Sequence, residues 1–154
     1  MVPFHKPCYC FCMEQYPIQQ KSLPEALLRE LGVAVVYLFG SQAEGIAGPM
    51  SDIDIGIVYA DADSNSLNRN RGELYQALYN IFTDVFDMRG FREIDIIMLD
   101  RAPLELRFDV ITHGTVIFET DPELRSDFEE RTAALYRDFK PLREESNRAV
   151  LQRV

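Results

Sequence analysis

The chain has 154 residues, of which 47% are hydrophobic and 27% charged, a composition typical of one globular domain. Its net charge of −9 argues against a nucleic-acid-binding protein, because phosphate backbones are bound by clustered lysine and arginine. No apolar run approaches the length of a membrane span, and the N-terminus lacks the basic segment and apolar core of a secretory signal. We therefore expect a cytoplasmic protein.

Residues 1–20 carry the least organised pattern in the chain. His5, Cys8, Cys10 and Cys12 could be assembled into a set of zinc ligands, but Cys-x-Cys-x-Cys is not the spacing of a common zinc site. We expect a disordered tail with free thiols over residues 1–20 and one folded domain over residues 21–154.

A short helix and a buried strand are the first expected elements. Ser22-Leu23-Pro24-Glu25 has the spacing of a capping box, which predicts a helix that runs to about Leu31 and is stopped by Gly32. The run Val33–Phe39 is rich in β-branched and aromatic residues. It predicts a buried strand that ends in a tight turn at Gly40-Ser41, followed by a short helix.

The segment Asp52–Val58 alternates strictly between polar or small residues and isoleucine or valine. A strand with this period places Asp52 and Asp54 on one face, about 7 Å apart along the strand. Neighbouring carboxylates repel each other, and a divalent cation such as Mg²⁺ offsets that cost. The turn at Gly40-Ser41 offers backbone N–H groups and a hydroxyl, which suit an anion. Phosphate donors beside a carboxylate metal site indicate nucleotide chemistry.

The spacing of apolar residues predicts the remaining elements. In chain order they are a helix over Leu67–Phe86, a strand over Glu93–Leu99, a helix over Ala102–Thr112, a strand over Thr115–Phe118 and a last helix that opens with Asp121-Pro122. We expect Pro141 to kink or break the last helix, because proline removes a helical hydrogen bond. The mixed charges that follow Pro141 indicate a solvated helix end.

Asp95 lies inside an otherwise apolar strand, where an unpaired carboxylate would be costly. If this strand neighbours Asp52–Val58, Asp95 completes a site of three carboxylates. Glu93 and Asp100 are the alternatives for the third position, but both lie at the ends of the predicted strand, where solvation explains them.

Gly40-Ser41, ten intervening residues and Asp52-x-Asp54 reproduce the GS-x10-DxD motif, so the chain resembles the polymerase-β-like nucleotidyltransferase superfamily. More closely, it looks like the minimal nucleotidyltransferase (MNT) antitoxins, which accompany HEPN-domain toxins in bacteria and archaea. The resemblance covers most of the chain. Many members carry a basic residue where this chain has Gln42 or Glu44, and the chain departs from the family at Glu44.

The resemblance implies an α/β (α+β) polymerase-β-like fold, in which a small mixed sheet of about three to five strands is covered by helices mainly on one face. It implies that Asp52, Asp54 and Asp95 hold two Mg²⁺ ions and that Gly40 and Ser41 hold the phosphates of ATP. It also implies a partner, because MNT antitoxins transfer AMP to a tyrosine of their cognate HEPN ribonuclease toxin. The C-terminal region would then be a surface that docks this partner.

Three other functions remain open on the sequence. The first is nucleotidyl transfer to a small molecule such as an aminoglycoside, which usually needs a further substrate-binding domain. The second is a non-catalytic antitoxin that acts by binding alone. In the third, the aspartates are loop caps in a protein that has lost its chemistry.

Overall fold

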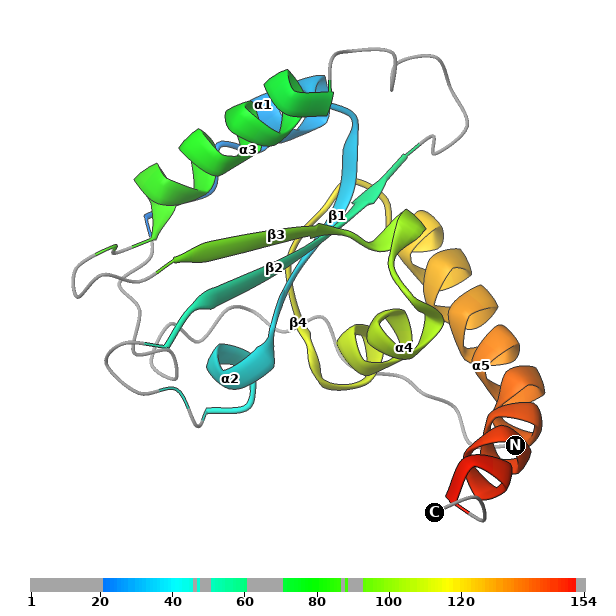
Figure 1. Ribbon diagram of the computed structural model, residues 1–154. Coiled ribbons are helices and arrows are strands. Elements are labelled where there is room, and N and C mark those ends of the chain that lie inside the picture. The colour runs from blue at the N-terminus through cyan, green and yellow to red at the C-terminus, as the bar shows by residue number, and fades with distance from the viewer. Residues whose placement is uncertain are drawn as a thin grey trace.

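The computed structural model describes residues 21–45, 47, 51–60, 71–86, 88 and 93–151 (Figure 1). The zinc-ligand and disordered-tail interpretations of residues 1–20 lie outside this part of the chain, as does the predicted helix start at Leu67. The elements are α1 (Glu25–Glu30), β1 (Val33–Phe39), α2 (Gly40–Ala43), β2 (Ile53–Tyr59), α3 (Arg71–Val85), β3 (Ile94–Met98), the 3-10 helix η2 (Leu99–Arg101), α4 (Leu104–His113), β4 (Thr115–Glu119) and α5 (Pro122–Leu151).

The strands form one four-stranded sheet in the order β3-β2-β1-β4. β1 lies antiparallel to both β2 and β4, whereas β2 and β3 are parallel. Parallel neighbours need a crossover connection, and α3 lies in the connection between β2 and β3. The mixed sheet is confirmed. The strand that carries Asp54 is also the direct neighbour of the strand that carries Asp95, which is the arrangement on which a site of three carboxylates depends.

Helices cover both faces of the sheet, which is why every residue of β1 is buried. Figure 1 shows α1 and α3 together on one side of the sheet and α4 and α5 on the other. Ile53, Ile55 and Ile57 of β2 pack with α1 and α3, and the opposite face of the sheet packs with η2, α4 and α5. We expected the helices to cover mainly one face of the sheet, and this prediction is wrong. Every residue of β1 is apolar, so both faces of the strand have to be shielded from water.

Two local details at α1 separate the structure from the sequence prediction. The predicted capping box is not formed, because Pro24 itself occupies the N-cap position and no side chain caps the helix. Ser22 therefore lies two residues before the N-cap. The predicted end is confirmed, because Gly32 adopts a φ of 78°, a left-handed conformation that favours glycine.

The last helix begins as predicted and then continues further than expected. The Oδ1 atom of Asp121 accepts a hydrogen bond of 2.8 Å from the backbone N–H of Glu123, which caps α5. Pro141 lies inside α5, and the helix is continuous on both sides of it up to Leu151. The proline therefore does not break the helix.

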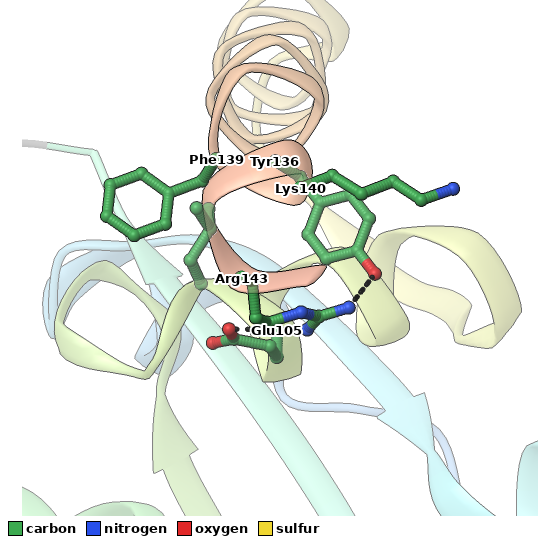
Figure 2. Close-up of a pocket in the computed structure, with 6 residues that line it drawn as sticks. Glu105, Tyr136, Phe139, Lys140 and Arg143 are labelled. Carbon is green, nitrogen blue, oxygen red and sulfur yellow. Dashed lines mark hydrogen bonds and ion pairs between the residues drawn. The ribbon is translucent and has the colours of Figure 1, made fainter. Parts of the chain in front are cut away.

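Contacts across Pro141 explain why the helix holds. The guanidinium of Arg143 donates to the hydroxyl of Tyr136 at 2.9 Å and to Oε1 of Glu105 on α4 at 3.3 Å, as Figure 2 shows. The Tyr136 ring stacks on Phe108 of α4, with 3.8 Å between the ring centroids. Both sides of the proline are thus tied to each other and to α4.

The apolar stripe of α5 is only partly buried. Phe128 packs against the core, and Thr132 is 1% exposed. Further along the helix, Leu135, Phe139 and Leu142 are 44%, 58% and 60% exposed. Contact between the apolar residues of α5 and the buried core therefore lies in the first half of the helix.

Candidate functional site

The structure brings Asp54 and Asp95 together on one face of the sheet. β2 and β3 are parallel, and in their register Asp54 lies opposite Asp95. Asp52 comes two residues before Asp54, so the alternation of the strand directs it to the same face. On the other side of Asp54 the register partner is Phe39, the last residue of β1. The predicted acidic residues therefore meet near the N-terminal ends of two adjacent strands.

The electrostatic environment of Asp54 reflects these neighbours. Burial raises the pKa of the Asp54 carboxyl above its ordinary value, and the charges of Asp95 and Asp52 raise it further. Burial disfavours the ionised carboxylate because it loses hydration, and the neighbouring carboxylates disfavour it by repulsion. A bound cation would reverse both effects. The cluster is therefore electrostatically suited to a positive ion.

The carboxylates are neighbours, but their oxygen atoms do not point to one common position. Within the described ranges, no three histidine, cysteine, aspartate or glutamate side chains are already arranged to hold a metal ion. Oδ1 of Asp52 accepts a hydrogen bond of 3.4 Å from the backbone N–H of Glu93. Asp52 and Asp95 are exposed, so their side chains can rotate towards Asp54. Hard oxygen donors are the ligands that Mg²⁺ takes, and it needs only one or two protein carboxylates. The residues fit a Mg²⁺ site.

Gly40 places the start of α2 directly against Asp54. It adopts a φ of 64°, and a Cβ atom at this position would overlap the Asp54 carboxylate. Only glycine combines this backbone conformation with so close an approach. Ser41 follows in the first turn of α2 and is half-buried. The residues predicted to hold phosphate are thus next to the acidic cluster.

The two alternative acids occupy different positions. Oδ2 of Asp100 accepts a hydrogen bond of 3.1 Å from the backbone N–H of Tyr59, at the far end of β2. Tyr59 is five residues beyond Asp54, on the order of 16 Å along a strand. Glu93 precedes β3, is exposed and contacts Asp52 through its backbone. Asp100 therefore lies at the other end of the sheet, away from Asp54. Among the three candidates, the residue paired with Asp54 is Asp95.

Gln42 lies at the centre of this region, although no pattern in the sequence indicates a role for it. Its side chain is 1% exposed and donates to the backbone carbonyls of Ser51 (3.2 Å) and Asp52 (3.4 Å). Glu44, by contrast, is exposed. A helix of four residues has no measurable hydrophobic period, so no pattern in the sequence could have marked Gln42 as buried.

Comparison with known families decides the class of this fold. The model of the family described as polymerase beta, nucleotidyltransferase matches residues 21–123. The chain belongs to the polymerase-β nucleotidyltransferase family. The matched range contains Gly40, Ser41 and all the clustered aspartates, so the site described above is the part of this nucleotidyltransferase that the family model covers.

Solved structures resemble this nucleotidyltransferase over most of its length. One is a crystal structure of a toxin–antitoxin with AMP-PNP, with 27% identity and a TM-score of 0.60 over 82% of this chain and 94% of that chain. Another is a tri-AMPylated HEPN toxin from Shewanella oneidensis in complex with MNT antitoxin, with 26% identity and a TM-score of 0.55 over 82% of this chain and 91% of that chain. The resemblance to MNT antitoxin structures is thereby confirmed.

None of the curated proteins matches this nucleotidyltransferase. Among the helices in the described part of the chain, none is long and apolar enough to cross a lipid bilayer.

Proposed function

We propose that this chain is an antitoxin that transfers AMP from ATP to a tyrosine of a HEPN-domain toxin. The observation that carries the proposal is the pairing of Asp54 with Asp95 beside the Gly40-Ser41 turn in a member of a nucleotidyltransferase family. The acceptor is suggested by the similar solved complexes, one with AMP-PNP and one with an AMPylated HEPN toxin.

The aspartates and the Gly40-Ser41 turn have different tasks in this proposal. Asp52, Asp54 and Asp95 would hold two Mg²⁺ ions. Bound there, the ions would neutralise charge on the phosphates and lower the pKa of the attacking hydroxyl. Gly40 lets the backbone of α2 lie against Asp54, so that a triphosphate held at the turn is also next to the carboxylates. The Ser41 hydroxyl would donate a hydrogen bond to a phosphate oxygen.

The reaction is a displacement at the α-phosphorus of ATP. The tyrosine oxygen forms a bond to this phosphorus, the bond from the phosphorus to the bridging oxygen breaks, and pyrophosphate leaves. The hydroxyl proton is released to solvent. The protein contributes positioning and electrostatic stabilisation rather than covalent chemistry, as in phosphoryl transfer generally.

Transfer of label from ATP is the direct test. The purified chain is incubated with Mg²⁺, a HEPN-domain protein from the same genome and ATP labelled at the α-phosphate, and protein-bound label is counted. ATP labelled at the γ-phosphate should leave no label on protein, which separates AMP transfer from phosphorylation. Mass spectrometry then identifies the modified residue, which we expect to be a tyrosine.

Two aspartate variants make the test specific to the site. Asp54→Asn should reduce the transfer rate a few hundredfold or more, by analogy with the loss of one transition-state contact of about 3–4 kcal/mol. Asp100→Asn is the matched control at the far end of the same sheet, and its rate should stay within about threefold of the native rate.

The alternatives make different predictions in the same experiments. An unchanged rate in Asp54→Asn would refute the role of the acidic cluster. Label on an aminoglycoside but not on the HEPN protein would refute the protein acceptor. If Asp54→Asn still neutralises the toxin at an equimolar dose, inhibition occurs by binding alone.

A further inference from the structure

Gln42 is a buried polar residue that joins the two halves of the candidate site. It lies in α2, directly after the Gly40-Ser41 turn, and only 1% of its surface is exposed. Its Nε2 donates to the carbonyl oxygens of Ser51 at 3.2 Å and of Asp52 at 3.4 Å. The side chain thus reaches from the candidate phosphate-binding turn to the residues that open the strand of Asp54.

The orientation of the Gln42 amide shows which of its atoms matters. Its Oε1 atom is buried and has no hydrogen-bond partner among the described residues. Rotating the amide by half a turn would place that oxygen against two carbonyl oxygens, which also accept and do not donate hydrogen bonds. Leaving a buried acceptor unpaired is unfavourable, so the position of the amide is explained by what the Nε2 donor binds.

The start of β2 is held from the opposite side by Glu93, the residue before β3. The backbone N–H of Ile53 donates to the carbonyl of Glu93 at 2.9 Å, and this bond does not depend on the orientation of the Asp52 side chain. Gln42 supplies the complementary tie from α2. The segment that enters β2 is therefore fixed between the turn that carries Ser41 and the strand that carries Asp95.

We propose that Gln42 is a positioning residue, which sets the distance between the Gly40-Ser41 turn and the aspartates by tethering α2 to the start of β2. Gln42 acts through the backbone of Ser51 and Asp52 and does not need to touch a substrate. Its catalytic consequence rests on the proposed function, but the tether itself is a property of the fold that can be measured without a substrate.

The first measurement is residue-resolved amide hydrogen exchange on the intact chain. Gln42→Met keeps the approximate length of the side chain and removes the donor. Exchange of the Ile53 and Asp54 amides should accelerate about tenfold or more, because local opening no longer breaks the Gln42 hydrogen bonds, while the amides of α5 keep their native rates.

The second measurement separates positioning from stability. In the labelled-ATP assay, Gln42→Met should lower kcat on the order of 10- to 100-fold and leave KM for ATP within about threefold, since the reacting groups are displaced but not removed. Leu78→Ala is the control, because Leu78 is fully buried against the opposite face of the sheet. It should destabilise the whole protein and leave kcat per folded molecule unchanged.

The outcomes distinguish this proposal from the proposed function. Native exchange rates at Ile53 and Asp54 in Gln42→Met would overturn the tether, as would a kcat equal to that of Leu78→Ala. If the native chain transfers no AMP, the proposed function fails, and the selective change in amide exchange still decides whether Gln42 holds the start of β2.

Discussion

Substitution of Gly40 separates the geometry of the site from the stability of the fold. In Gly40→Ala, a left-handed backbone conformation in a non-glycine residue costs roughly 1–2 kcal/mol. The new Cβ would also overlap the carboxylate of Asp54, which has to rotate away. Because this group is the end of a side chain, its rotation adds only about 0.5–1.5 kcal/mol. We expect a total loss of about 1.5–3.5 kcal/mol in the free energy of unfolding.

Gly32→Ala is the matched control for this experiment. Gly32 has a φ of 78°, and nothing lies within 4 Å of the position its Cβ would take, so the variant incurs only the backbone cost. Urea unfolding should therefore place the two variants within about 1.5 kcal/mol of each other. Nucleotidyl transfer should differ far more, on the order of 100-fold, because only Gly40→Ala moves Asp54. Equal transfer rates would refute the close approach of Gly40 to a working carboxylate.

Three further substitutions test individual parts of the structure. Asp54→Asn should stabilise the metal-free protein by up to about 1 kcal/mol in urea unfolding, since it removes a charge that is disfavoured by burial and by the neighbouring carboxylates; a loss of stability would contradict this. Burial raises the pKa of Asp100, so its ionisation weakens the fold as the pH rises. The stability of Asp100→Asn relative to the native chain should therefore improve between about pH 4 and pH 7, and a constant difference would contradict the assignment. Pro141→Ala should raise the helical circular-dichroism signal and stabilise the protein by about 1–3 kcal/mol. An unchanged signal would show that Pro141 does not destabilise the helix.

The sequence predicted best those features that depend on residues close together in the chain. The alternation of Asp52–Val58 was enough to assign the face of each side chain, and the structure agrees. The pairing of Asp54 with Asp95 is a longer-range fact. It was anticipated from the resemblance to the superfamily, which implies a third acidic residue at Asp95. The burial cost expected for Asp95 does not apply, because its side chain is exposed, and Asp54 repels it rather than compensating its charge.

Local pattern was insufficient where two local signals competed. The spacing from Ser22 to Glu25 matches a capping box, yet Pro24 takes the N-cap position, and the box does not form. Pro141 has the sequence signature of a helix break. The helix does not break, because Arg143 on one side of Pro141 binds Tyr136 on the other side and Glu105 of α4. A helical period in the sequence does not reveal such contacts.

Burial of individual side chains in α2 and α5 depends on tertiary contacts, which the sequence pattern does not reveal. The apolar spacing of α5 predicts a helix correctly, but whether Leu135 and Phe139 are covered depends on what lies beside them, and in this chain they are exposed. Gln42 lies in a helix of four residues, and its hydrogen bonds reach the chain nine and ten residues later. Its burial therefore follows from the way α2 folds back onto β2.

A single face of β2 combines two environments, and this explains how the acidic cluster can be both ordered and accessible. Asp54 and Gly56 point to the same face, two residues apart. At Gly56 the absence of a side chain lets Leu99 of η2 close onto the strand, since a Cβ there would lie 2.9 Å from Leu99 Cδ1. At Asp54 the neighbours are Phe39 and Asp95, and Asp95 is exposed. The backbone that carries the aspartates is thus part of the packed core, whereas their carboxylates lie at the boundary between the core and solvent. A site that binds a nucleotide from solution and positions it precisely needs both features.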